Sequence, residues 1–265
     1  GLYPLDIFNH LVHQLHAETS KYLNNEKQLS RGTIEKSEKM KERKGKDQKR
    51  TPFDCMRGKI KIHSTISPPK GGEKLKEINK TISFHFLTCE VPFLTLYKDE
   101  QKRQIIPQVS LQSLLSKFDG KSETTSPSTE MPGNVQLSTY ELKSLPEYLV
   151  IHLKRSSVGQ NTPIGKNKTL VTFPTRRFDL NHLVSKNPKN LIYNFVGSIA
   201  EDSNEEIQTL EHMKHAQRAS YHVILRHEPT DKFLKCDPVS CKSIGEESVC
   251  IGNTVLVVFT RNLKP

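Results

Sequence analysis

Residues 218–238, RASYHVILRHEPTDKFLKCDP, contain two short segments of alternating polarity on either side of a turn that includes Pro229. Residues 221–226 place Tyr, Val and Leu at alternate positions, and residues 232–237 follow the turn with a second short segment. A two-residue period is typical of strands, because successive side chains point to opposite faces of a sheet. The stretch therefore predicts two short strands joined by a turn, with Ser220 at the head of the first.

Similar segments follow one another after Tyr140, whereas the helical patterns come earlier in the chain. Such a segregation predicts an α+β domain, with helices packed to one side of a largely antiparallel sheet rather than alternating βαβ units. The segments with β-branched or aromatic alternation are LPEYLVIHLKR, KTLVTFPTRRFDL, NLIYNFVGSIAED, SYHVILRHE, KFLKCD and TVLVVFTRN.

Two helices are predicted, over residues 4–23 and 110–120. Pro4 suits the first turn of a helix, Ser110 suits an N-cap, and Gly120 suits a helix end. Apolar residues recur at helical spacing in both segments: Leu5, Phe8, Leu11, Val12 and Leu15 in the first, and Leu111, Leu114, Leu115 and Phe118 in the second.

Two further segments, 54–65 and 81–92, alternate like half-buried strands and are predicted to pair as an antiparallel ribbon. Residues 25–50 are rich in Lys, Arg and Glu and poor in large apolar residues, which predicts a mobile surface insertion. Residues 121–136 are rich in Ser, Thr, Pro and Gly and predict a second flexible loop. The sequence therefore predicts one domain over residues 1–265 that contains these two insertions.

Charge and apolar content limit the compartment and the partners. The 265 residues carry a formal net charge of +11, with a pI near 9.3, which favours acidic partners such as RNA or acidic protein surfaces. The basic run at 25–50 interleaves acids with its lysines and has no aromatic residues for stacking on bases, so RNA contact is not favoured. No run of about eighteen apolar residues and no signal-peptide layout is present, so we expect no membrane contact and an intracellular protein.

The cysteines are odd in number and form no CxxC pair, which argues against a disulfide framework and a structural zinc site. Reduced, mostly buried thiols are expected at Cys55, Cys89, Cys236, Cys241 and Cys250. In an intracellular protein the sequons at Asn79 and Asn167 are chance matches. No cofactor is expected.

Several long stretches resemble the ubiquitin-specific peptidases, in the papain-like cysteine protease superfamily. LPEYLVIHLKR at 145–155 and YNFVGSIAED at 193–202 resemble two strands of that family, and SYHVILRHEPTDKFLKCD at 220–237 resembles the segment that begins with the catalytic Gly-His-Tyr. Residues 4–16 and 95–120 resemble its inactive branch of the spliceosomal tri-snRNP. The resemblance covers nearly the whole chain and implies a peptidase-like fold that lacks its amino-terminal part.

The resemblance also locates the catalytic positions. A cysteine protease of this family needs a thiolate, a histidine that takes its proton, and a group that orients the histidine. By position, Asp237 matches the orienting carboxylate and Tyr221 matches the residue after the histidine, but the histidine itself is replaced by Ser220. A hydroxyl cannot accept a proton near neutral pH as imidazole does. The family's cysteine box lies upstream of the helix with which this chain begins, so no intact catalytic group is expected.

Four other histidines, in the segment from 212 to 227, offer alternative sites. His212 and His215 have an H-x-x-H spacing followed by His222 and His227, but they lack a cysteine or carboxylate partner at a zinc-like interval. His215 as a surrogate base for Ser220 would have to act on a nucleophile that this chain lacks. No metal site is predicted, and exposed histidines are the simplest interpretation.

The resemblance implies a non-catalytic scaffold in pre-mRNA splicing that supports tri-snRNP assembly or stability in the nucleus, with spliceosomal proteins as partners. Two alternatives stay open: an active ubiquitin-specific cysteine protease whose cysteine box lies outside this chain, and a module that binds ubiquitin without cleaving it.

Overall fold

The computed structural model describes residues 3–15, 17, 52–69, 72–93, 97–98, 101, 104–155, 167–184, 190–202 and 220–262. The chain forms two compact units, one over Leu2–Cys55 and one over Met56–Pro265. The predicted insertion at 25–50 lies outside the described residues. Among the helices of the described ranges, none is long and apolar enough to cross a membrane.

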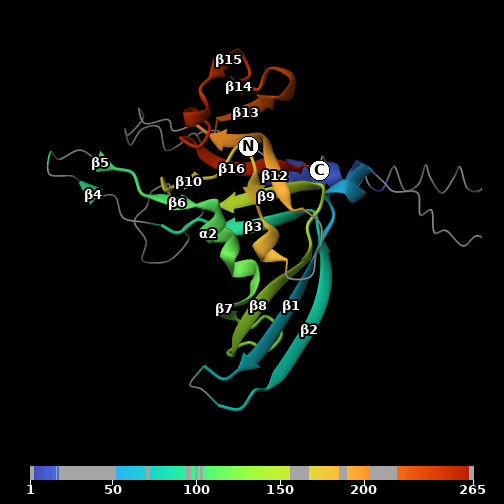
Figure 1. The fold of residues 1–265 in the computed structure, drawn as a ribbon. Coiled ribbons are helices and arrows are strands. Elements are labelled where there is room, and N and C mark those ends of the chain that lie inside the picture. Colours follow the sequence, from blue (N-terminus) through green and yellow to red (C-terminus); the bar gives the residue numbers. More distant parts are fainter. Residues whose placement is uncertain are drawn as a thin grey trace, which may run out of the picture. The chain divides into compact units, whose positions relative to one another are not determined.

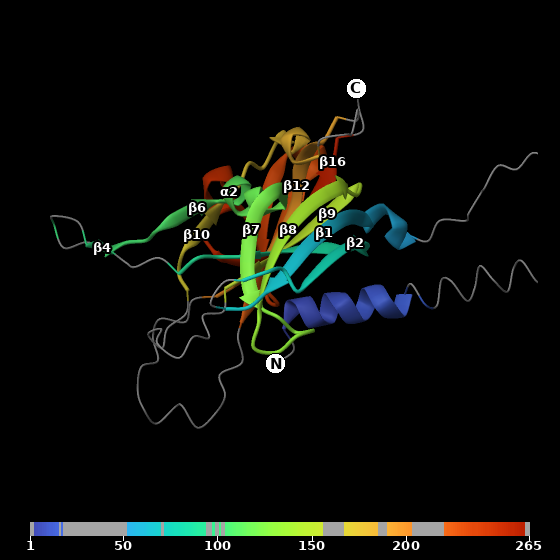
Figure 2. The same cartoon turned by 90° about the horizontal axis from the view of Figure 1, so that it is seen from below.

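The smaller unit contains a helix over residues 4–15, visible as the dark blue coil in Figure 2. This confirms the helical pattern that begins at Pro4, while residues 18–23 of the predicted helix lie outside the described part. Val12 is buried, whereas Leu11 and Leu15 are exposed, so the predicted apolar stripe is only partly covered. A 3-10 helix, η1, spans Pro52–Met56.

The larger unit is built on a main sheet whose strand order is β15-β14-β13-β12-β16-β9-β3, with β11 also paired to β12. All pairs are antiparallel except β3 with β9, which confirms the expected mostly antiparallel α+β architecture (Figure 1). The strands are β3 (Phe86–Glu90), β9 (Tyr148–Lys154), β11 (Phe178–Asp179), β12 (Ile192–Glu201), β13 (Tyr221–His227), β14 (Lys232–Cys236), β15 (Cys241–Ile244) and β16 (Asn253–Arg261).

A second, four-stranded antiparallel sheet has the order β2-β1-β8-β7, and Figure 1 shows its strands side by side. The predicted ribbon is right only in part: β1 (Gly58–Ser67) pairs with β2 (Lys76–Phe84), but the chain then enters β3 of the main sheet. The loop predicted at 121–136 is wrong. Most of it belongs to β7 (Asp119–Pro127) and β8 (Val135–Ser144), because pairing between these polar strands satisfies the backbone despite their turn-forming composition.

The second predicted helix forms, but it is shorter than expected. α2 spans Leu111–Leu115 and continues as the 3-10 helix η2 (Ser116–Phe118). The Ser110 side chain accepts a hydrogen bond from Ser113 N at 3.1 Å, as an N-cap does. The other short elements are β4 (Tyr97–Lys98), β5 (Gln104–Ile105), β6 (Gln108–Ser110), β10 (Leu170–Thr172), η3 (Asn181–Leu183), η5 (Glu228–Thr230) and η6 (Glu246–Ser248).

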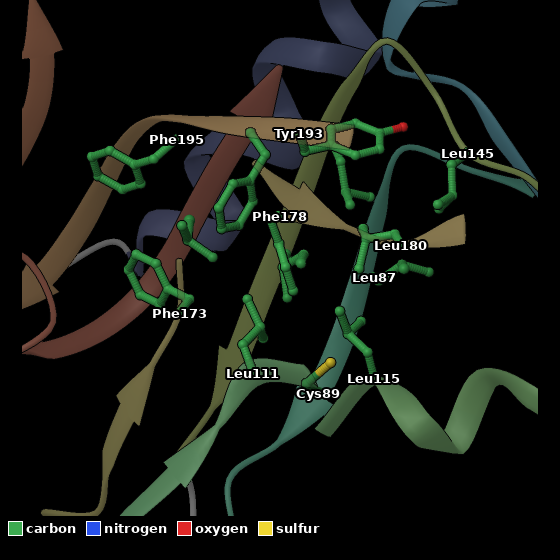
Figure 3. Close-up of a cluster of buried hydrophobic side chains, with 14 of the residues drawn as sticks. Leu87, Cys89, Leu111, Leu115, Leu145, Phe173, Phe178, Leu180, Tyr193 and Phe195 are labelled. Carbon is green, nitrogen blue, oxygen red and sulfur yellow. The ribbon is translucent and has the colours of Figure 1, made fainter. Parts of the chain in front are cut away.

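The core of the larger unit joins aromatic side chains of the main sheet to leucines of α2 (Figure 3). Phe259 of β16 is fully buried, and its ring centroid lies 5.4 Å from Phe178 and 5.8 Å from Phe173. Tyr193 is also fully buried, and its hydroxyl donates a hydrogen bond to Pro146 O at 2.5 Å. Burial of this kind stabilises the fold by removing apolar surface from water while keeping polar atoms paired.

A network of buried polar groups fixes the segment that precedes β10. The amide nitrogen of Asn167 donates to Val91 O at 2.9 Å and to Pro92 O at 3.2 Å, while its carbonyl oxygen accepts from Thr169 N at 3.1 Å. Arg155 Nε donates to Thr254 O at 2.8 Å. The sequon at Asn167 is therefore a structural asparagine, only 4% exposed.

Candidate functional site

The end of the β12–β13 pair brings three polar residues onto one face of the main sheet. Ala200 of β12 lies opposite His222 of β13, and beyond them Asp202 N donates to Ser220 O at 2.8 Å. Alternate residues of a strand share a face, so Asp202, Ser220 and His222 point to the same side. The position that resembles the catalytic histidine is thus part of a polar cluster.

Asp202 is the centre of this cluster. His222 Nδ1 lies 2.6 Å from Asp202 Oδ1, and the Ser220 side chain also hydrogen-bonds to the Asp202 carboxylate. Burial acts to raise the pKa of Asp202, but the hydrogen bonds from Ser220 and His222 outweigh it, so the pKa lies below its usual value. The carboxylate is therefore held ionised between a hydroxyl and an imidazole.

Sequence reasoning missed this pair. His222 was expected to be exposed, yet it is buried with 5% of its surface accessible, because it shares its face with Ala200 and Ile224. Asp202 was not proposed as a site residue, since it precedes a long segment that separates it from His222 in the sequence. The alternation of β13 would have placed His222 beside Ser220, but only the register with β12 identifies Asp202.

The other two positions carried over from the family have different surroundings. Tyr221 lies opposite Glu201, and partial burial together with that carboxylate raises the pKa of the phenol. Asp237 is exposed and forms a tight turn: its Oδ1 accepts from Val239 N at 2.8 Å and from Ser240 N at 2.7 Å. These bonds, with one from the Ser240 hydroxyl, hold the pKa of Asp237 below its usual value. The Asp237 carboxylate thus accepts its hydrogen bonds from Val239 and Ser240 of the same turn.

The expectation of reduced thiols throughout is wrong for two cysteines. Cys236 and Cys241 form a disulfide, because the β14–β15 register places them directly opposite each other with their Cα atoms 4.1 Å apart. Cys89 is buried, and burial raises its pKa to about 11. Burial also raises the pKa of Cys250, whose Sγ donates to Phe173 O at 3.5 Å.

The remaining histidines do not form a metal site in the described part of the chain. His227 Nδ1 lies 2.7 Å from the Thr230 hydroxyl, and His212 and His215 are outside the described residues. No group of three His, Cys, Asp or Glu side chains that could hold a metal ion is found among the residues that the structure describes.

We expect Asp202→Ala to lower the free energy of unfolding near pH 7 by about 1–3 kcal/mol, less than for a fully buried pair because the carboxylate is partly exposed. Since the pKa of Asp202 is lowered on folding, its contribution is present above the usual carboxyl pKa of about 3.9 and is lost as pH falls through the lowered value. The stabilities of the wild type and Asp202→Ala should therefore become more alike as pH falls, and urea unfolding between pH 3 and 7 would measure this. The exposed Glu228→Ala is the control and should stay within about 0.5 kcal/mol of the wild type. A difference that is constant with pH would contradict the role of the charge.

The strand order, the mostly antiparallel main sheet and the short packed helices define a ubiquitin-specific-peptidase fold of the papain-like class. The family model for ubiquitin carboxyl-terminal hydrolase matches residues 5–255, and the chain belongs to this family.

Among its relatives is human ubiquitin carboxyl-terminal hydrolase 39, 27% identical over 183 residues that cover 68% of this chain and 30% of that protein. Another is the pre-mRNA-splicing factor SAD1 of Saccharomyces cerevisiae, 26% identical over 206 residues that cover 77% of this chain and 42% of that protein. The chain thus spans less than half the length of these relatives.

A solved structure with the same fold is the SAGA Ubp8/Sgf11/Sus1/Sgf73 DUB module bound to ubiquitin aldehyde. It aligns with a TM-score of 0.59 and 15% identity, over 98% of this chain and 49% of that one. At this identity the likeness concerns the fold alone.

Proposed function

We propose that the chain is part of a non-catalytic ubiquitin-peptidase-like scaffold in pre-mRNA splicing, acting in the nucleus in tri-snRNP assembly or stability. The splicing role is supported by SAD1 of yeast, a splicing factor of the same family. The observation that carries the non-catalytic part is the serine at position 220, hydrogen-bonded to Asp202 where the family resemblance calls for a histidine.

The chemistry of this position supports the loss of general-base catalysis. A base must accept a proton near neutral pH, and the hydroxyl of Ser220 has no such capacity. His222 is close by, and Asp202 pairs with its Nδ1 as a carboxylate orients a catalytic histidine, but the residue is only 5% exposed, so its ring is withdrawn from a substrate. The carboxylate that would orient a histidine, Asp237, is bonded within its own turn.

The cysteines of the larger unit offer no convincing nucleophile. The thiolate is the reactive form of cysteine, and burial raises the pKa of both Cys89 and Cys250. Cys236 and Cys241 are joined to each other. The geometry of the larger unit therefore supports a non-catalytic role.

Ubiquitin binding without cleavage is a second candidate function, favoured by the likeness in fold to a deubiquitinating module solved with ubiquitin aldehyde. Titration of labelled ubiquitin against the full-length protein tests it. Saturable binding supports this function, and a flat titration at high micromolar concentrations removes it.

We expect the full-length wild type, and the 265-residue chain with Ser220→His, to hydrolyse ubiquitin-AMC no faster than buffer, beside a catalytically active family member assayed in parallel. In the 265-residue chain Ser220→His restores an imidazole but adds no nucleophile, and catalytic groups that act as a unit give little when one is missing. Because Ser220 is exposed, the variant should fold, with a stability change within about 1 kcal/mol in thermal unfolding. Turnover that a single cysteine substitution abolishes, in either protein, would overturn the non-catalytic proposal.

A further inference from the structure

The β14–β15 hairpin brings two cysteines together at the edge of the main sheet. Asp237 N donates to Ser240 O at 2.9 Å, so the pair just before it, Cys236 with Cys241, occupies a non-hydrogen-bonded position of the ladder. Opposed residues approach most closely at such positions, with Cα atoms about 4.5 Å apart. The 4.1 Å separation of these Cα atoms places the two sulfurs within bonding reach without a change of register.

We propose that Cys236 and Cys241 form a reversible dithiol–disulfide site that exchanges with small disulfides of the glutathione class. The thiolate of one cysteine attacks glutathione disulfide, forming a mixed disulfide and releasing one glutathione thiolate. The second cysteine, as its thiolate, then attacks the protein sulfur of the mixed disulfide and releases the other glutathione. Two protein thiols are oxidised, one glutathione disulfide is reduced to two glutathione molecules, and two protons are taken up by the released thiolates.

Accessibility distinguishes this pair from the buried cysteines of the larger unit. Cys241 is exposed and Cys236 is partly exposed, whereas Cys89 is fully buried and Cys250 is largely covered beside Phe173. Reactive cysteines are accessible ones, and buried thiols with raised pKa values are inert. Cys89 and Cys250 therefore serve as internal controls that we expect not to react with glutathione disulfide.

The energetics of the hairpin favour reversibility. The sequence separation of the two cysteines is 5, so their bond closes a very short loop and removes little entropy from the unfolded chain. The hairpin also has other support, since Phe233 of β14 is buried and β14 pairs with β13 over its length. Reduction should thus loosen the turn without unfolding the sheet.

Oxidation would fix the turn that presents Val239. This side chain is 94% exposed at the tip, and its own backbone N donates to Asp237 Oδ1. With the disulfide closed, residues 237–240 are held both by that carboxylate and by the bonded sulfurs at their base. The proposal does not depend on whether the protein cleaves or binds ubiquitin, so its test is separate from that of the proposed function.

The test equilibrates full-length protein without oxygen in a series of glutathione to glutathione-disulfide ratios, followed by acid quenching, alkylation with N-ethylmaleimide and peptide mass spectrometry. We expect the 236–241 pair to convert from two alkylated thiols to an internal disulfide, with a dependence on the square of the glutathione concentration over that of its disulfide. Cys89 and Cys250 should stay alkylatable after unfolding at every ratio. Cys241→Ser should leave Cys236 as a thiol or a mixed disulfide, and Cys250→Ser should leave the transition unchanged.

A second readout separates a reversible site from an inert bond. Hydrogen exchange at the amides of Val239 and Ser240 should be roughly tenfold faster in the reduced protein, which corresponds to about 1.4 kcal/mol of local stability. Thiols that remain free at all ratios, oxidation that stops at mixed disulfides, or a bond that excess glutathione cannot reduce would each overturn the proposal. Equal exchange in the two states would overturn the effect on the turn.

Discussion

Phe259→Ala should lower the free energy of unfolding by about 3–5 kcal/mol, the range found when a large aromatic side chain is removed from a core. Phe259 is fully buried in β16, between β12 and β9 in the main sheet. Its ring lies within 6.2 Å of the rings of Phe173, Phe178 and Phe195, measured between centroids. Truncation would therefore remove the common partner of three aromatic rings and leave a cavity that rigid strands cannot fill.

The measurement is chemical denaturation of the wild type and the variant. If the two proteins show the same dependence of unfolding free energy on denaturant concentration, a shift of the unfolding midpoint reports the change in stability. Phe259→Leu retains most of the apolar volume and should cost less than the alanine variant. Val239→Ala, at the exposed tip of the β14–β15 turn, should stay within about 0.5 kcal/mol of the wild type. An alanine variant at position 259 as stable as Val239→Ala would show that the core packs differently.

Local chemistry was predictable where a few neighbouring residues decide the structure. The N-cap at Ser110 could be predicted from the sequence of that turn alone, and the structure contains it. The helix that follows buries Leu111 and Leu115. The alternation after Tyr140 likewise predicted strands, because period-two patterns arise from the pleat itself. The family match extended these local predictions to a fold.

Pairing between distant segments was not predictable from the same patterns. Residues 121–136 have the composition of a loop, yet β7 forms because it pairs with β8. Local residue propensities do not predict a pairing of this kind. Asp202 and His222 meet only because β12 and β13 pair in one register. Cys236 and Cys241 are close in sequence, but counting cysteines and inferring the compartment excluded a bond that the hairpin register permits.

Asn167→Ala should have the second largest effect, lowering the free energy of unfolding by about 2–4 kcal/mol. The side chain is 4% exposed and supplies hydrogen bonds to the carbonyls of Val91 and Pro92 and to the amide of Thr169. Alanine would leave Val91 O and Thr169 N without that partner in a buried position, whereas Pro92 O keeps a hydrogen bond from the Thr169 hydroxyl at 3.1 Å. Each unsatisfied group costs about 1–3 kcal/mol, and relaxation and water entry reduce the sum, which is why we expect less than two full penalties.

Asn167→Asp distinguishes the role of the donated hydrogens from that of side-chain volume. The carboxylate has nearly the shape of the amide, but it would turn a negative oxygen toward the carbonyls of Val91 and Pro92. At pH 7 it should therefore destabilise at least as much as alanine, despite filling the space. Burial against carbonyls raises the pKa of such an acid above its unfolded value, so its protonated form, which donates one hydrogen, should recover part of the stability as pH falls. Urea unfolding of both variants at pH 7 and pH 4.5 measures this, and an Asp variant as stable as the wild type at pH 7 would mean that the amide hydrogens do not hold these carbonyls.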